Sequence, residues 1–490
     1  MRYTMDKGDI SLVSFNYDEK VTYGGKMPYG SSDNPAYDLV WKTVERLGLG
    51  TAQNPLQSII KPGNTVLIKP NLIDHIPGTY TRPEVVMPII DMAVAAGAGK
   101  IYIADAGINF FETEQTLAST RYSEMARFLQ GENTAIKIEA VNLNRLPRWR
   151  WISLGEDSSF YDSGYRDDEV GFDRGKSLLN HKYYWTADCL GKSPKGKPLG
   201  WYAISDIVLD ADVVINMPKM KTHWTMIVTL SLKNLVGCTM ASTYDQKAGE
   251  GANLARIPHC HVKDSNYFEN DVSARVLQDL NKIILYCDKK GQLKNKRQRK
   301  YLTVIDGIEA MERSQTSLYD SKGKRRMSRM VLAGEDPVST DMVACRAMGY
   351  DYRHVPTLKK GTMDKIHRIG NYNQDNIVIT GENLDKRINH VFSFNDRWKK
   401  DARFLAIRKF SPPKIRTLTR EGKKVIAVID NCMAAHLSYD GGNLITMSRK
   451  DNSYFVELPL SAKNVCIFAH DQYLNSISKV CDFAASHYNE

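Results

Sequence analysis

The stretch ADVVINMPKMKTH, residues 211–223, carries the pattern on which the fold prediction depends. Residues 211–215 are an apolar run rich in β-branched side chains, which is typical of a buried strand in a parallel sheet. Residues 216–223 hold two lysines and a histidine, at the point where such a strand gives way to a connection. We therefore predict a core strand over residues 211–219, with positive charge gathered at its carboxyl end.

Strand-like and helix-like segments alternate on both sides of this stretch. We predict strands at 64–72, 100–107, 136–143, 301–312, 329–337 and 376–382, and helices at 82–98, 122–129, 225–236, 272–288 and 339–348. Such alternation is typical of parallel βαβ units. The expected fold class is α/β, with a mostly parallel sheet covered by helices on both faces, plus a small C-terminal β-rich domain.

The length of 490 residues exceeds what one hydrophobic core usually supports, so we expect more than one domain. The α/β domain is placed at 1–385, a basic linker region at 386–424, and the β-rich domain at 425–490. Within the first domain, residues from about 147 to 200 lose clear periodicity and are rich in aromatic side chains. We interpret this segment as an insertion that forms a lid or binding element.

Composition excludes several classes of protein. No run approaches the roughly 20 apolar residues that a membrane helix needs, and the N-terminus lacks a secretory apolar core. We expect a cytoplasmic protein or the processed form of an exported one, with no membrane partner. The net charge of +11 is matched by seven positive charges in 289–300 and four in 322–326. A nucleic-acid partner is therefore not expected, because such proteins spread basic residues over a face.

The eight cysteines show no CxxC motif and no clustered spacing. Isolated thiols in a reducing compartment fit this distribution better than a disulfide framework. No iron–sulfur cluster is expected, because four closely spaced thiolates are its usual ligands. The cofactor is otherwise open, with Mg²⁺ as the one candidate, and the sequence also leaves the oligomeric state open.

Polar residues recur where the predicted strands end. These residues are Lys69, Asn71, Asp105, Lys219, Lys221, His223, Asp306, Glu309, Glu335 and Asp336. In open parallel sheets, ligands bind beyond the carboxyl ends of the strands, because loops from several units meet there. Strand ends are polar in every α/β protein, so each residue alone is more often simply solvated. Their repetition at five strand ends predicts a site.

Seven motifs in order also carry a family resemblance. They are VLIKPNL, TRPEVVMPII, IYIADAG, DADVVINMPKMKTH, TLSLKNLVG, VIDGIEAME and VLAGEDPVSTDMVACRAMGYD. Over residues of about 60–385 the chain resembles the DUF362 family, a domain of unknown function. The resemblance implies an α/β fold and site residues Lys69, Asn71, Asp105, Lys219, Lys221, Thr222, His223, Lys233, Asn234, Asp306, Asp336 and Asp341. Relatives often carry a Gly-rich stretch where this chain has MERSQTS, residues 311–317, which leaves activity open.

Roles follow from the chemistry of these side chains. The substrate-binding candidates are Lys69, Asn71, Lys219, Lys221, Thr222, Lys233 and Asn234, since lysines suit phosphate or carboxylate. The catalytic candidates are His223, Asp105 and Asp306, with His223 as the acid or base, or else as a structural histidine. Lys233 and Asn234 reach the others only if the predicted 225–236 helix folds back across the sheet.

Asp336 and Asp341 are the metal candidates, with Mg²⁺ as the ion that such carboxylates favour. The same EDPVSTD segment also fits the start of a helix, with Asp336 or Ser339 as its cap.

Three functions stay open at this point. The first is an enzyme acting on an anionic small molecule that carries phosphate or carboxylate. The second is redox or unusual-cofactor chemistry, as in iron–sulfur-bearing relatives. The third is a non-enzymatic binding protein that uses its basic segments and its C-terminal domain. The sequence therefore leaves it uncertain whether the chain is an enzyme at all.

Overall fold

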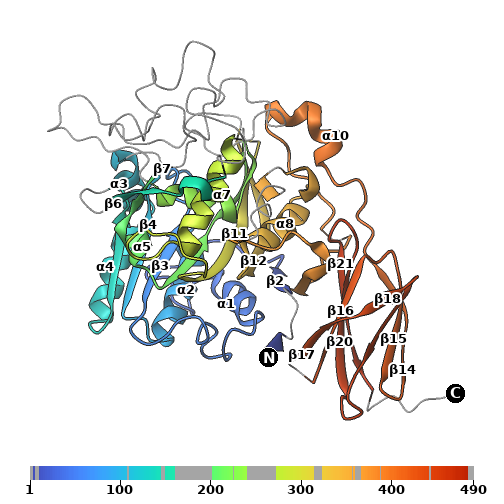
Figure 1. The fold of residues 1–490 in the computed structure, drawn as a ribbon. Coiled ribbons are helices and arrows are strands. Elements are labelled where there is room, and N and C mark those ends of the chain that lie inside the picture. Colours follow the sequence, from blue (N-terminus) through green and yellow to red (C-terminus); the bar gives the residue numbers. More distant parts are fainter. Residues whose placement is uncertain are drawn as a thin grey trace.

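A ten-stranded sheet forms the centre of the N-terminal part of the chain in the computed structural model (Figure 1). The structure describes residues 4–5, 10–107, 110–144, 149–159, 201–223, 226–239, 272–313, 323–355, 357–358, 366–386, 388–440 and 443–483. Eight strands lie in the order β13 (Ile377–Gly381), β2 (Ser11–Tyr17), β12 (Lys324–Gly334), β11 (Lys300–Glu312), β8 (Val213–Met217), β3 (Thr65–Pro70), β4 (Lys100–Asp105) and β5 (Lys137–Asn142).

Parallel pairing dominates this sheet. The pairs β11–β8, β8–β3, β3–β4 and β4–β5 are all parallel, as is β13–β2. Of these eight strands, β12 alone runs against its neighbours β11 and β2. The predicted α/β class with a mostly parallel sheet is confirmed, and the predicted strand at 211–219 is β8.

The segment after β8 differs from the prediction. A second strand, β9 (Lys219–His223), follows at once and pairs with β11, and β10 (Ile227–Thr229) returns antiparallel to β9. The short helices α6 (Ser231–Asn234) and η5 (Leu235–Cys238) complete the segment. The predicted helix over 225–236 is therefore wrong. Ile227 has a φ of 66°, a left-handed backbone that an α-helix cannot include.

Both faces of the sheet are covered, because successive side chains of each strand point to opposite sides. Val66 and Ile68 of β3 pack in one core with α1 (Tyr37–Glu45), α2 (Pro83–Ala95) and α4 (Tyr122–Glu132). Leu67 packs in the other core with α5 (Asp206–Asp210), α7 (Val272–Tyr286) and α8 (Pro337–Ala347). Each fully buried side chain of this kind contributes about 1.5–3 kcal/mol. The helix α3 (Phe110–Ser119), which precedes α4, was not predicted.

The C-terminal part is built from two further sheets that pack face to face. One has the order β1 (Thr4–Met5), β17 (Asn443–Thr446), β16 (Ala434–Tyr439), β20 (Asn464–His470) and β21 (Ser476–Asp482). The other has β14 (Lys414–Glu421), β15 (Lys424–Asp430), β19 (Ser453–Glu457) and β18 (Ser448–Lys450). Leu437, Ile467, Ala427 and Tyr454 share the core between them. A β-rich C-terminal part is confirmed.

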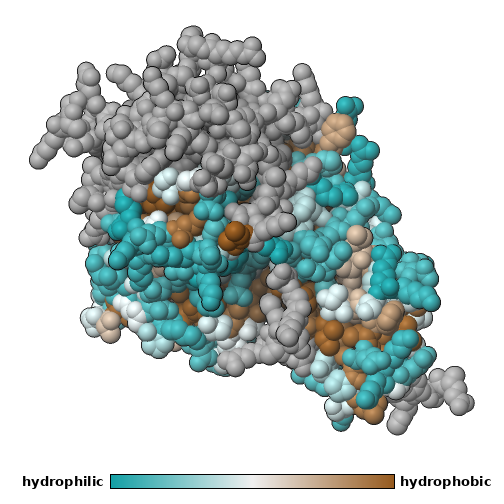
Figure 2. Space-filling view, viewed as in Figure 1, coloured by the Kyte–Doolittle hydropathy of each residue, from teal (hydrophilic) through white to brown (hydrophobic). Residues whose placement is uncertain are grey.

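The outer face of the five-stranded sheet also packs against the α/β part, because Phe468 and Leu444 join the core of α1 and α2. Ser476 and Leu384 exchange hydrogen bonds across this contact. Part of the segment expected as a linker is ordered differently, since β14 pairs with β15 inside the C-terminal sheets. The domain limits themselves stay predictions. In the view of Figure 2, apolar residues gather over these C-terminal strands.

The expected aromatic insertion at about 147–200 lies mainly outside the described residues. Its described part holds β6 (Trp149–Ser153) and the turn η1 (Gly155–Asp157), and β6 pairs antiparallel with β7 (Trp201–Ser205). The MERSQTS stretch is described only to Arg313. Among the described helices, none has the length and apolar character required to cross a membrane.

Candidate functional site

The strand β9 carries three of the predicted site residues at alternate positions, Lys219, Lys221 and His223. Alternation in a strand places them on one face. All three are buried, with side chains no more than 1% exposed. They lie beside the carboxyl ends of β3, β8 and β11, because β9 continues from β8 and pairs with β11 at Asp306 and Met311.

Lys219 is held by a buried ion pair. Its Nζ lies 2.8 Å from Asp306 Oδ2 and donates to the Tyr23 hydroxyl at 2.7 Å. The Tyr23 hydroxyl in turn donates to Asp306 Oδ1 at 2.5 Å, and the Arg82 backbone N–H donates to Oδ2 at 3.0 Å. Burial lowers the pKa of Lys219, while Asp306 opposes that shift. Burial and the Asp306 charge raise the pKa of Tyr23 well above its ordinary value.

A second buried ion pair joins β3 to β4. Lys69 Nζ lies 2.8 Å from Asp105 Oδ1, and Asp105 also accepts backbone N–H groups from Leu72 at 2.6 Å and Ala106 at 2.9 Å. Gly237 packs directly against this pair. A Cβ atom added at Gly237 would lie 1.9 Å from Asp105 Oδ1 and 2.8 Å from Lys69 Nζ, so this position requires glycine.

Three asparagines connect the strand ends. Asn71 Nδ2 donates to Asn234 Oδ1 at 2.8 Å, and Asn234 Nδ2 donates to Asn216 Oδ1 at 2.7 Å and to the Lys69 carbonyl at 3.1 Å. Asn216 Nδ2 donates to Tyr301 and to Ser231. Buried polar groups that are fully satisfied in this way fix one arrangement of the elements that carry them. Asn234 reaches the others because β10 turns the chain back.

Lys221 differs from the other two lysines. Its Nζ donates to Asn71 Oδ1 at 3.0 Å and to the Thr79 carbonyl at 2.8 Å, and both acceptors are neutral. Within the described residues, no carboxylate lies in contact with it. Burial lowers the pKa of Lys221 well below its ordinary value. The charges of Lys233 and Lys219 act in the same direction, whereas Asp74 and Asp105 oppose them.

His223 supports the turn that follows β9. Its Nδ1 accepts the backbone N–H of Met226 at 3.0 Å, so the proton of the neutral ring resides on Nε2. This contact is with a backbone N–H group, and it gives His223 a structural role beside the predicted acid–base role. Its neighbour Thr222 is buried and pairs with Val228, and Lys233 lies half-buried in α6.

The two predicted metal ligands have backbone partners instead. Asp336 is the N-cap of α8, where it accepts the Ser339 N–H at 2.8 Å, and it also accepts Asn371 N–H at 2.7 Å. Asp341 accepts the N–H groups of Ser231 and Leu232 at 2.7 and 2.9 Å, at the start of α6. Burial raises the pKa of Asp341 to about 8, and these donors oppose the shift.

The capping alternative for Asp336 is thus observed, and a metal role for Asp336 and Asp341 stays a prediction. The described ranges contain no group of three or more histidine, cysteine, aspartate or glutamate side chains arranged to hold a metal ion.

The profile of a protein family matches residues 66–154 and 180–346, and its description is "Domain of unknown function (DUF362)". The two matched ranges contain every predicted site residue and cover more than half of the chain. This chain belongs to the DUF362 family.

Individual relatives of this DUF362 chain are distant. It is 28% identical over 202 residues to a Synechocystis protein named thylakoid-associated protein sll1697, an alignment that covers 40% of this chain. The DUF362 chain spans 46% of that relative's own length. A crystal structure of a Thermotoga maritima protein aligns with a TM-score of 0.29 and 10% identity over 56% of this chain and 51% of that one. A likeness this weak carries no information about the fold or the function of this chain.

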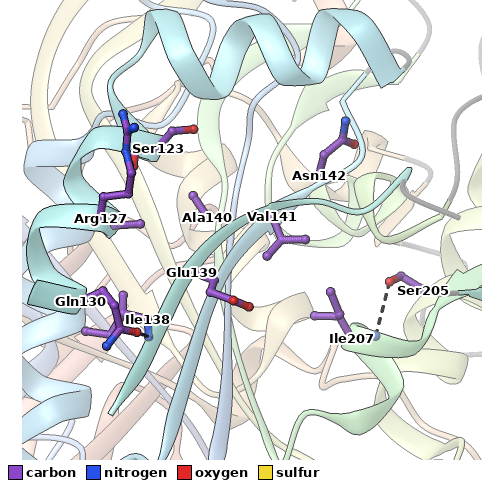
Figure 3. Close-up of a pocket in the computed structure, with 11 residues that line it drawn as sticks. Ser123, Arg127, Gln130, Ile138, Glu139, Ala140, Val141, Asn142, Ser205 and Ile207 are labelled. Atoms are coloured by element: carbon purple, nitrogen blue, oxygen red, sulfur yellow. Dashed lines mark hydrogen bonds between the residues drawn. The ribbon is translucent and has the colours of Figure 1, made fainter. Parts of the chain in front are cut away.

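Two grooves in the described part of the DUF362 chain lie away from the lysine cluster of β3 and β9. One of about 720 Å³ runs along the edge strand β5, between Arg127 and Gln130 of α4 and Ser205 with Ile207 (Figure 3). Another of about 510 Å³ lies between Asp18, Lys42 of α1 and Glu382. Neither is lined by Lys69, Lys219 or Lys221. The lysine cluster is the stronger candidate site, because it holds buried ion pairs, whereas the charged side chains that line the two grooves are not buried.

Several residues of the cluster were not predicted from the sequence. Tyr23 and the backbone of Arg82 complete the Asp306 contacts, and Tyr23 lies outside the residues that match DUF362. No pattern in its loop singles it out. Asn216 could have been predicted as part of the cluster, because an asparagine inside an apolar strand needs buried hydrogen-bond partners. Gly237 stands in the LVG motif, where only the structure shows the neighbouring carboxylate.

Proposed function

We propose that this DUF362 protein is an enzyme that acts on a small molecule carrying a phosphate or carboxylate group. The observation that carries the proposal is the contrast between Lys221 and the other two buried lysines around β9. Lys69 and Lys219 each lie 2.8 Å from a carboxylate, whereas Lys221 contacts only neutral oxygens. The Lys233 charge acts on Lys221 as well. A small anionic ligand suits this group of basic side chains at the strand ends.

The location supports an enzyme more than a simple binding protein. The cluster lies at the carboxyl ends of parallel strands, where α/β enzymes place their ligands. It also gathers lysines with lowered pKa values and a tyrosine with a raised one, and such shifts concentrate at catalytic sites. In the proposed division of roles, Lys233 provides charge for the anion, and His223 gives a proton to the substrate.

The ion-paired residues have a different part in this proposal. Asp105 and Asp306 keep Lys69 and Lys219 in fixed positions, and Asn71 and Asn234 tie the strand ends together. Thr222 backs the same strand from its other face. These groups supply the rigid frame that catalytic side chains require.

Thermal unfolding with inorganic phosphate tests the proposal. A ligand at about 100 times its dissociation constant adds roughly 2.7 kcal/mol of stability, so Tm should rise with phosphate concentration. Lys233→Met should weaken the effect at least about tenfold in apparent Kd, in line with the loss of one charge-assisted contact. Lys290→Met, which removes an exposed lysine from the basic 289–300 segment, is the matched control. Equal weakening by both substitutions would mean non-specific attraction and would reject the site.

A further inference from the structure

The hydrogen-bond partners of Lys221 distinguish its protonation state from that of its neighbours. A lysine ammonium has three N–H donors, whereas the neutral amine has two and one lone pair. Lys221 Nζ has two acceptors in contact, Asn71 Oδ1 at 3.0 Å and the Thr79 carbonyl at 2.8 Å, and both are neutral. This set satisfies the neutral amine completely and leaves its lone pair unused.

Lys69 and Lys219 provide the internal comparison. Lys69 contacts the Asp105 carboxylate and the Pro70 carbonyl, and Lys219 contacts the Asp306 carboxylate and the Tyr23 hydroxyl. Both are arranged as ammonium ions. The three lysines are equally buried, so burial alone does not separate Lys221 from the other two. The difference lies in the absence of a contacting carboxylate at Lys221 among the described residues.

We propose that the amine of Lys221 is a nucleophile that forms an imine with the carbonyl carbon of a small anionic aldehyde or 2-oxo acid. The inference rests on the proposed function, because it identifies the substrate class of that same site. A lysine that is desolvated and next to other cations is the usual form of an imine-forming lysine. Lys233 and Lys219 are the neighbouring cations here.

The step balances without any redox partner. The Nζ lone pair attacks the carbonyl carbon and forms a C–N bond, and the carbonyl oxygen takes up the two amine hydrogens and leaves as water. The product is a neutral imine, or an iminium ion if a proton is added. Asn71 and the Thr79 carbonyl orient the amine before the attack. The positive charge at Lys233 suits the carboxylate or phosphate of the substrate.

Reductive trapping of the full-length protein tests this proposal. The probe is glyoxylate, the smallest 2-oxo acid, with cyanoborohydride at pH 7, followed by digestion and mass spectrometry. An ordinary lysine is neutral in only about one part in 10³ at this pH, so Lys221 should be converted to carboxymethyl-lysine at least roughly tenfold faster than exposed Lys290. Inorganic phosphate should slow the labelling. Lys221→Met should remove the fast phase, and Lys290→Met should retain it.

Glycolate separates this proposal from the function on which it rests, because it carries the same carboxylate and no carbonyl. If phosphate and glycolate raise Tm but Lys221 is labelled no faster than Lys290, the imine is rejected and anion binding stands. If Lys221 is labelled fast but neither anion raises Tm, the imine stands and the anion site is rejected. Equally fast labelling of Lys290 and Lys221 would also reject the proposal, because Lys221 would then react like an exposed lysine.

Discussion

The lysine cluster of the large sheet and a histidine pair of the C-terminal sheets bury polar groups in opposite ways. Lys69 and Lys219 each lie against a carboxylate and have a further hydrogen-bond partner beside it. His436 and His470 lie on the face of β16 and β20 that packs against the α/β part, with ring centres 6.5 Å apart.

Neither histidine Nε2 makes a hydrogen bond of ordinary geometry, although the backbones of Asp375 and Ile377 lie beside the rings. Burial lowers the pKa of His436 to about 3 and lowers that of His470 as well. In the first region, ion-pair partners compensate the buried charges. In the second region, the two histidines can stay buried only while their rings are neutral. Substitutions should therefore lower the free energy of unfolding most in the first region, and acid should lower it through the second.

The largest expected effect is that of Lys219→Met. It leaves Asp306 buried with only uncharged donors, and breaking a buried ion pair in this way costs about 3–5 kcal/mol. Urea unfolding at pH 7 measures the loss. The double variant Lys219→Met/Asp306→Leu should recover part of it, because the unpaired charge is then absent. Equal losses in the single and the double variant would contradict the ion-pair account.

Asp341→Ala should come next. It leaves the N–H groups of Ser231 and Leu232 buried without an acceptor, at about 1–3 kcal/mol each, so a total of about 2–4 kcal/mol is expected. Asp341→Asn keeps one acceptor oxygen and should lose less. Thermal unfolding compares the two variants. A loss that is the same for Ala and Asn would show that these N–H groups do not decide the effect.

A smaller effect is expected from acid at the histidine pair. His436 is neutral in the folded protein down to pH of about 3, but its unfolded form takes up a proton near pH 6.5. Its contribution to stability is therefore complete above pH 6.5 and is lost as pH falls toward 3, with about 2 kcal/mol lost by pH 5. His436→Phe should remove this part of the pH dependence, measured as the difference in unfolding free energy from the wild type between pH 7 and 5. If the wild type and the variant differ in unfolding free energy by the same amount at pH 7 and pH 5, the role given to His436 is wrong.

The smallest change is expected for Lys221→Met, within about 1 kcal/mol at pH 7, because only neutral hydrogen bonds are lost while the desolvated amine is removed. Between its lowered pKa and 10.5, the wild type should gain stability relative to the variant as pH rises, because only the unfolded chain binds the proton there. Urea titrations at pH 7 and 10 test the sign. A loss as large as that of Lys219→Met would place Lys221 in an ion pair.

The sequence predicted the parallel βαβ core well, because each strand and helix there has a strong local pattern. Predicted segments such as 82–98 and 272–288 correspond closely to α2 and α7. It missed the strand β2 altogether, which lies between β12 and β13. Pairing between such distant segments leaves no local signature. The helix predicted at 225–236 failed for a similar reason, since pairing of β10 with β9 overrides the local helical preference.

The candidate site was predicted in part. Parallel strands end at one edge, so the gathering of Lys69, Asp105 and Lys219 near each other followed from the fold class. Which lysine pairs with which carboxylate did not follow, because pairing depends on register and side-chain direction. Tyr23 could not be found, since its loop has no pattern. The roles assigned to these residues stay predictions.

The place of β2 between β12 and β13 has a consequence for synthesis of the chain. Residues 11–17 leave the ribosome well before their pairing partners, which emerge about 300 residues later, or roughly 15–60 s at ordinary rates of translation. Until then β2 is an apolar segment with two unpaired edges, which chaperones recognise and other chains can capture. The last strand of the large sheet to be made, β13, then closes it against the first. The central sheet therefore stays incomplete until residues 377–381 have been made.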